Sequence, residues 1–264
     1  NEAYVYLPRN DGSYNCVDGA MLDCATDDAV ESTPTSAIHN MTNGAWGPYN
    51  VVDDKWAYFY AGIREVQTFL HYIALTDVVE NNEIPGSDMS RLKDRLIGEA
   101  YFLQALYYFE LTRRYGDVPL VESLLEPDIA ALDIPRTPYD EIVQRIVTWC
   151  ENAASILPVQ YSDVNVGRAT KGAALMLKAR TLLYAASELH NPNHDQQKWI
   201  DAEKATREFL EFNKTNGEPY KLYASFADQF LVTYNSEVIF ATQYLNRKDV
   251  KQMNVPNAYT GGLG

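Results

Sequence analysis

The chain has 264 residues, of which 46% are hydrophobic and 22% charged, a composition that predicts a folded protein with a sizeable core. It carries 22 Lys and Arg against 36 Asp and Glu, so its formal net charge is −14. Because this charge repels phosphate backbones, the composition excludes nucleic acid as a partner. No stretch approaches the roughly 18–20 apolar residues that span a bilayer. Residues 1–20 lack a charged leader with an apolar core, so we expect the chain to begin after any targeting segment.

The first part of the chain, residues 1–54, is expected to be loop-rich. Gly, Asn, Asp, Ser, Thr and Pro dominate it as far as Asn50, and these residues favour turns. A loop region of this length inside an ordered protein tends to carry function. Three cysteines are too few for a disulfide framework. Cys16 and Cys24 are close enough along the chain for a bridge across their loop, whereas Cys150 is expected to be buried on a helix.

Two long helices are predicted next. The first runs from Lys55 to about Val79, where apolar residues recur at helical spacing. The second ends abruptly at Gly116, because glycine adopts the positive φ that closes a last turn and Pro119 prevents continuation. Its apolar positions recur at steps of three and four residues, which indicates one buried stripe: Leu92, Leu96, Ala100, Leu103, Tyr107 and Leu111.

Three further helices follow by pattern. Thr137 is expected to cap the first of them with its hydroxyl, with Pro138 at the first helical position, and Pro158 ends it. The other two run from about Thr170 to Leu189 and from about Lys198 to Phe212. Near the end of the chain, the β-branched and compact segment Glu237–Thr242 predicts a short strand.

The last two helices are expected to form an antiparallel pair similar to a tetratricopeptide unit. The first of them contains small residues that let a neighbour approach closely, and the second carries Ala202, Ala205 and Phe209 at the matching spacing. Stacked helical pairs bury a face that one pair cannot bury alone. The predicted fold class is therefore all-α, with tetratricopeptide-like helical pairs, long loops and a minor β element.

Several motifs resemble the SusD/RagB family of surface nutrient-binding lipoproteins, and the resemblance covers most of residues 27–264. The long helix carries the most specific of them, and others follow in the family's order. They are Gly98-Glu99-Ala100, Tyr107-Tyr108-Phe109, Tyr115–Leu120, Pro135–Tyr139, Gly167–Lys171, Asn191-Pro192 with Trp199, and Asn235–Phe240. Asp27-Asp28 and Trp56 stand where the family has an acidic pair and a Trp-initiated helix.

The resemblance implies a single SusD-like helical domain over residues 1–264, loop-rich in residues 1–54 and incomplete. The family's C-terminal half is expected to be absent, and the missing lipidation cysteine fits a trimmed start. The resemblance also implies a protein that binds polysaccharide or oligosaccharide without cleaving it. Such a protein is a lipoprotein on the surface of the outer membrane, held to the membrane by its lipid anchor only. It delivers glycan to a SusC-like TonB-dependent transporter.

The candidate ligand-binding residues are Trp46, Tyr49, Asn43 and Asp28. Trp46 and Tyr49 form an aromatic pair in a turn-rich loop. Sugar C–H groups stack on an indole or phenol face, while sugar hydroxyls need short polar partners such as Asn43 or Asp28. The alternative is that both aromatic rings pack against the helical core from their loop.

No catalytic residue, cofactor or metal site is predicted. Asp27-Asp28 and Asp53-Asp54 are adjacent in loops, a pattern more typical of turns and helix caps than of the spaced carboxylates of a glycosidase. Glu188, His190 and His194 surround a proline-containing loop, so the two histidines do not share one helical face. The sequence also lacks a calcium-binding loop motif.

Two other functions are compatible with the sequence. A tetratricopeptide-like adaptor would bind a peptide or protein partner in a groove lined by helix residues. A glycosidase would release product from a labelled oligosaccharide. Exposed loop aromatics near Trp46 would favour glycan binding over the adaptor.

Overall fold

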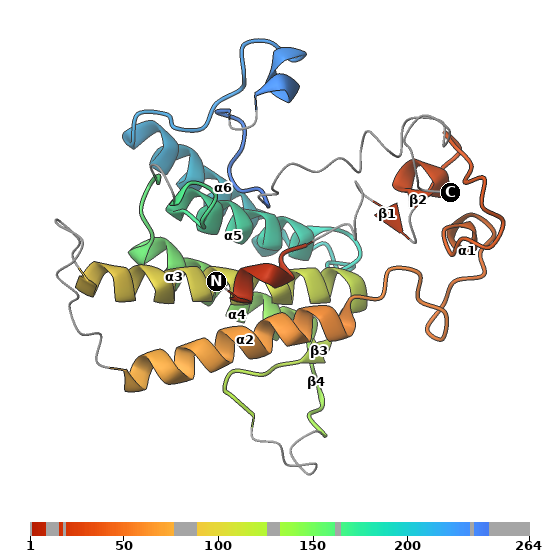
Figure 1. Ribbon diagram of the computed structural model, residues 1–264, viewed down its shortest axis with the longest axis horizontal. Coiled ribbons are helices and arrows are strands. Elements are labelled where there is room, and N and C mark those ends of the chain that lie inside the picture. Colours follow the sequence, from red (N-terminus) through yellow and green to blue (C-terminus); the bar gives the residue numbers. More distant parts are fainter. Residues whose placement is uncertain are drawn as a thin grey trace, which may run out of the picture. The chain divides into compact units, whose positions relative to one another are not determined.

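The computed structural model describes residues 2–8, 16–17, 20–76, 89–125, 133–161, 165–232 and 235–242 (Figure 1). The chain divides into two compact units. The helical unit comprises Asn1–Leu7 and Ala57–Ala241, and the loop unit comprises Pro8–Trp56 and Thr242–Gly264. The helical unit contains all the long helices, apart from the first residue of one of them.

The described residues are mainly helical, which confirms the predicted all-α class. Five long helices dominate: α2 (Trp56–Leu75), α3 (Met89–Tyr115), α4 (Tyr139–Ile156), α5 (Lys171–Ala186) and α6 (Gln196–Thr215). Shorter helices are α1 (His39–Thr42) and the 3-10 helices η1 (Glu2–Tyr6), η2 (Leu22–Ala25) and η5 (Asp228–Leu231). The minor β element consists of two antiparallel pairs, β1 (Cys16–Val17) with β2 (Ala20–Met21), and β3 (Val118–Pro119) with β4 (Arg136–Thr137).

Helices α3 to α6 form an antiparallel stack, as Figure 1 shows for the yellow, green and blue ribbons. Tyr108 of α3 lies against Trp149 of α4, with ring centroids 5.2 Å apart. Lys178 of α5 joins the helices on either side of it. Its Nζ lies 2.7 Å from a carboxylate oxygen of Glu151 on α4 and 2.9 Å from one of Glu208 on α6. Consecutive helices therefore pack as the predicted pairs.

Helix α3 forms the centre of the helical unit. Both Tyr107 and Tyr108 are fully buried, and each directs its hydroxyl to a backbone carbonyl, that of Ala3 for Tyr107. The helix ends as predicted, since Gly116 adopts φ +67° and its N–H donates to Thr112 O at 2.9 Å. Four positions of the predicted stripe are buried in this unit and two, Leu92 and Leu96, are half-buried; the buried ones are Ala100, Leu103, Tyr107 and Leu111.

The predicted cap of α4 was wrong. Pro138 rather than Thr137 occupies the N-cap position, and it makes no side-chain hydrogen bond to the helix. Instead, Asp117 Oδ1 accepts the Tyr139 backbone N–H at 2.8 Å. Thr137 pairs with Val118 in the β3–β4 ladder, so the ladder determines its backbone conformation.

The strand predicted over Glu237–Thr242 was also wrong, because these residues form turns. Val238 N–H donates to Asn235 O at 3.1 Å, and the Glu237 carboxylate accepts Tyr223 N–H at 2.6 Å. The first bond closes a turn at the start of the segment, and the second joins the Glu237 side chain to the chain around Tyr223. The apolar character of the segment serves packing, since the Phe240 ring lies 4.9 Å from that of Phe102.

Helices α5 and α6 have side-chain caps at their first turns. Thr170 accepts the Ala173 N–H, and Asp195 accepts the Gln197 N–H. Helix α5 ends at Ala186, three residues before the predicted end, and α6 extends beyond its predicted bounds at both ends. Cys150 is fully buried on α4 as predicted, and burial raises the pKa of its thiol.

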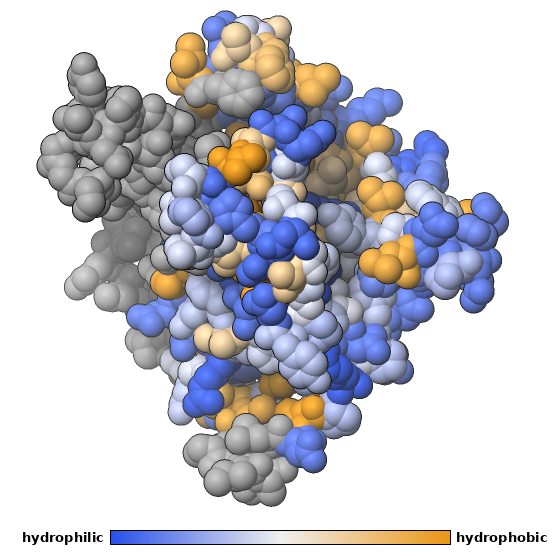
Figure 2. All heavy atoms as spheres, turned by 90° about the vertical axis from the view of Figure 1, so that its right-hand side faces the viewer, coloured by the Kyte–Doolittle hydropathy of each residue, from blue (hydrophilic) through white to orange (hydrophobic). Residues whose placement is uncertain are grey.

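The Cys16 side chain lies outside the described residues, so its pairing with Cys24 stays a prediction. Figure 2 shows mainly hydrophilic side chains on one face of the molecule, with apolar side chains in small scattered groups. None of the helices in the described ranges combines the length and the apolar character needed to cross a membrane.

Candidate functional site

Three of the four predicted ligand residues share one braced turn of the loop unit, residues 43–50. At its start, Asn43 Oδ1 accepts the Ala45 N–H at 2.9 Å. At its end, Asn50 Nδ2 donates to Ala45 O at 2.8 Å. Gly44 adopts φ +74°, a conformation that glycine tolerates without strain. Side-chain amides therefore hold this turn from both ends.

The tip of the turn presents the two aromatic rings. Gly47 and Asn50 exchange two backbone hydrogen bonds of 3.1 and 3.0 Å, which leaves Pro48 and Tyr49 as a two-residue turn between them. Tyr49 is fully exposed, and Trp46 is 60% exposed. Neither ring is therefore buried within the loop unit.

The base of this turn is fixed by a small core within the loop unit. Ile38 is fully buried there, packed against Cys24, Ala25 and Val52. Ser36 is also buried, and its hydroxyl accepts the Ile38 N–H at 3.4 Å. The apolar side chains thus go inward while Trp46 and Tyr49 remain outside.

Asp28 lies in a separate turn. Its backbone N–H donates to Thr26 Oγ1 at 3.1 Å, and the Thr26 hydroxyl donates to Asp23 O at 2.7 Å. Asp28 is exposed. Within the described part of the loop unit, its carboxylate shares no hydrogen bond with the turn at residues 43–50.

The other carboxylates of the loop unit include turn and cap residues. Asp54 Oδ1 accepts the Trp56 N–H at 3.0 Å at the start of α2. Glu31 accepts the Thr33 N–H at 2.9 Å, and this bond lowers the pKa of the Glu31 carboxyl below its usual value. Asp54 therefore caps a helix as expected, and Glu31 stabilises a turn.

His190 has a role in packing, whereas His194 is exposed. The His190 ring stacks on the Tyr139 ring with centroids 3.6 Å apart and planes within 4° of parallel. Burial, followed by the nearby Lys198 ammonium, lowers the pKa of His190. Among the residues that the structure describes, no cluster of three or more His, Cys, Asp or Glu side chains is arranged to hold a metal ion.

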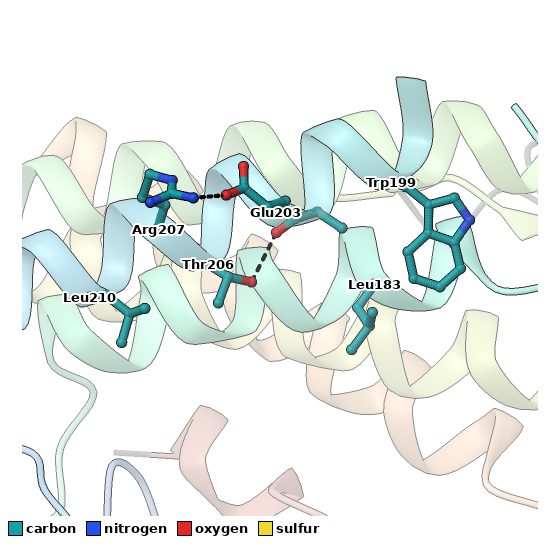
Figure 3. A pocket seen from close by; sticks show the side chains of 7 residues that line it. Leu183, Trp199, Glu203, Thr206, Arg207 and Leu210 are labelled. Atoms are coloured by element: carbon teal, nitrogen blue, oxygen red, sulfur yellow. Dashed lines mark hydrogen bonds and ion pairs between the residues drawn. The ribbon is translucent and has the colours of Figure 1, made fainter. Parts of the chain in front are cut away.

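One surface feature was missed by the sequence reasoning. A hollow of about 350 Å³ lies on helices α5 and α6, with Leu183, Trp199 and Leu210 along it and the Glu203–Arg207 ion pair at its edge (Figure 3). Trp199 follows the apolar spacing of α6, yet it is 46% exposed. Periodicity alone does not distinguish a buried position from one at the edge of a stripe.

The described residues thus combine stacked antiparallel helices with a braced aromatic turn in a separate unit. Residues 15–183 match the sequence model of a SusD-like family that is described as starch-binding and associating with the outer membrane. The chain belongs to this SusD-like family, which confirms the resemblance drawn from its motifs.

Individual relatives are similar over large parts of this chain. SusD-like protein P25 of Formosa agariphila is 25% identical over 203 residues, which are 76% of this chain and 33% of that protein. A SusD-like carbohydrate binding protein from Bacteroides fragilis is 27% identical with a TM-score of 0.64, over 85% of this chain and 40% of that one. A second SusD-like protein from the same species is 26% identical with a TM-score of 0.62, over 93% and 43%. The chain thus spans about a third of the length of that curated relative.

Proposed function

We propose that this chain binds oligosaccharide or polysaccharide without cleaving it. The observation that carries the proposal is the exposed pair Trp46 and Tyr49 on a turn braced by its own hydrogen bonds. Two exposed aromatic rings on one short turn offer an apolar surface that a ligand can cover. A sugar ring matches this surface, because its C–H faces stack on aromatic rings and its edges carry hydroxyls.

The turn also supplies polar groups beside the rings. Asn43 Oδ1 accepts the Ala45 N–H, so this oxygen helps to hold the turn. The NH₂ group of the same amide is the donor that we propose for a hydrogen bond to a sugar hydroxyl. Asp28, which lies in a separate turn, would accept a hydrogen bond from a sugar hydroxyl. Because the turn is braced before binding, less conformational entropy is lost when the ligand is held.

The comparisons support a glycan as the ligand. The family description names starch, and one structure of the same fold, 24% identical with a TM-score of 0.60, is a laminarin binding SusD-like protein. We propose that the complete protein is a lipid-anchored lipoprotein on the outer face of the outer membrane. There it would deliver glycan to a SusC-like TonB-dependent transporter.

Non-catalytic binding is the second part of the proposal. Asp54 caps a helix and Glu31 braces a turn, so neither stands ready as the acid or base of glycoside hydrolysis. Incubation with a labelled oligosaccharide tests this part, with no product expected. Product released by the wild type at a rate above buffer would contradict it.

The binding test uses a polysaccharide array that includes starch, laminarin and other plant and algal glycans. We expect the chain to retain at least one glycan, and Trp46→Ala to lose that retention. Trp199→Ala is the matched control, since it removes an exposed tryptophan from the helical unit and is expected to bind as the wild type does. Unchanged retention by Trp46→Ala would remove Trp46 from the site. The absence of any retained glycan would contradict the proposed function.

A further inference from the structure

The segment Glu2–Leu7, called the strap below, lies against helices α2 and α3 of the helical unit. Leu7 is only 4% exposed, and the Tyr6 ring lies 5.4 Å from the Tyr58 ring of α2. A side chain at Gly62 would place its Cβ 2.8 Å from Tyr6 Cβ. Glycine at this position of α2 therefore lets the strap approach the helix closely.

Tyrosine hydroxyls hold the backbone of the strap. The Tyr107 hydroxyl of α3 donates to Ala3 O. The Tyr58 hydroxyl of α2 lies 3.0 Å from Val5 O and 3.1 Å from Leu7 O, so the two carbonyls share its proton. Tyrosine hydroxyls thus bind the backbone carbonyls of Ala3, Val5 and Leu7.

The Tyr4 side chain ties the strap to two more segments. Its hydroxyl donates to Glu99 Oε2 at 2.9 Å and accepts the Ala169 N–H at 3.1 Å. Glu99 is 2% exposed, and Arg168 Nη1 lies 2.9 Å from the same carboxylate oxygen. The strap is therefore joined to α3 and to the turn that leads into α5.

The strap also closes the base of a long excursion. The chain leaves the helical unit after Leu7 and returns to it at Ala57. The Tyr58 hydroxyl, one residue beyond the point of return, bonds to Leu7 O, the last carbonyl before the departure. Both ends of residues 8–56 are consequently fixed close together on the helical unit.

We propose that the strap is a conformational clasp that limits the motion of residues 20–56 and so keeps the turn at residues 43–50 ready for ligand. Holding the two ends of such an excursion close together removes many of its conformations, so less entropy is lost when a ligand orders it. The clasp itself is independent of the glycan, whereas its effect on binding rests on the proposed function.

The test opens the clasp in the full chain with Tyr4→Phe combined with Tyr58→Phe. Both substitutions keep the rings and remove the hydroxyls. Tyr72→Phe is the matched control, because Tyr72 is an exposed tyrosine of the same helix as Tyr58. Amide hydrogen exchange, read by mass spectrometry, compares residues 20–56 with helices α4 to α6.

We expect exchange over residues 20–56 to rise about fivefold or more in the double variant, with α4 to α6 and the control unchanged. Exchange that rises over the strap alone would overturn the proposal, because the excursion would then not depend on the clasp. An equal rise in α4 to α6 would also overturn it, since the strap would then be an ordinary part of the core.

A second readout uses the array glycan that the wild type retains. The double variant is expected to bind it several-fold more weakly, while Trp46→Ala loses binding without faster exchange. An unchanged affinity together with faster exchange would contradict the role of the clasp in binding. If the wild type retains no glycan, the proposed function fails. The exchange measurement then still shows whether the strap limits the motion of residues 20–56.

Discussion

Asp117 and Tyr139 are 22 residues apart in the chain, yet the Asp117 carboxylate accepts the Tyr139 backbone N–H at 2.8 Å. Asp117, two residues beyond the end of α3, thereby caps the start of α4. In addition, Arg136 Nη1 donates to Asp117 O at 2.6 Å. The segment Gly116–Pro119 therefore ends α3 and also connects it to the start of α4.

Replacing Asp117 with Ala is expected to lower the free energy of unfolding by about 1 kcal/mol, because an N–H at the start of α4 loses its acceptor. Urea unfolding at pH 7 measures the change. Asp133→Ala is the control, since it removes an exposed carboxylate from the same connection. Equal stability of the two variants would show that water replaces the cap without loss.

Replacing Gly172 with Ala is expected to destabilise the protein by about 1–3 kcal/mol through overpacking. The new Cβ would overlap Cε2 of the Tyr220 ring and would lie 2.7 Å from the Tyr220 hydroxyl oxygen. Tyr220 is held in place, because its hydroxyl bonds to that of Thr170 and its backbone N–H to Asn213.

Thermal unfolding measures this effect, with Gly47→Ala as the control. The space around Gly47 is open, so a methyl group meets nothing there. A Gly172→Ala protein as stable as the control would mean that Tyr220 moves aside freely.

Alkaline pH is expected to destabilise the folded chain through its buried tyrosines. Burial raises the pKa values of Tyr4 and Tyr107 well above the ordinary value of about 10. Below pH 10 both the folded and the unfolded states keep these protons, so the contribution to stability is complete. Above pH 10 the unfolded state releases protons that the folded state holds, and the free energy of unfolding falls as pH rises.

Urea unfolding at several pH values from 8 to 11 tests this dependence. Tyr107→Phe serves as the comparison, since it removes one of the titrating hydroxyls and is expected to reduce the slope above pH 10. A free energy of unfolding that stays constant up to pH 11 would contradict the effect of burial.

Much of the helical unit could be predicted because its signals are local. The stripe of α3 repeats at helical spacing, and Gly116 with Pro119 marks its end. The turn around Trp46 could likewise be placed from its Gly, Asn and Pro residues. Periodicity and turn propensity depend on neighbours along the chain, so one sequence contains them.

What could not be predicted depends on residues that are distant in sequence. The cap from Asp117 to Tyr139 and the bond from Tyr4 to Glu99 require the fold to exist first. Segment 237–242 has the composition of a strand, but composition does not tell whether a partner strand lies beside it. The exposure of Trp46 was undecided for the same reason, since a loop aromatic is equally compatible with packing and with display.

Oxidative footprinting of the chain with and without its bound glycan is the most direct measurement of ligand contact at the aromatic turn. Hydroxyl radicals label exposed Trp and Tyr side chains, and mass spectrometry reports each one separately. At saturating glycan we expect oxidation of Trp46 and Tyr49 to fall several-fold while that of Trp199 stays the same. Unchanged oxidation of Trp46 and Tyr49 in the presence of bound glycan would contradict the assignment of this turn as the binding site.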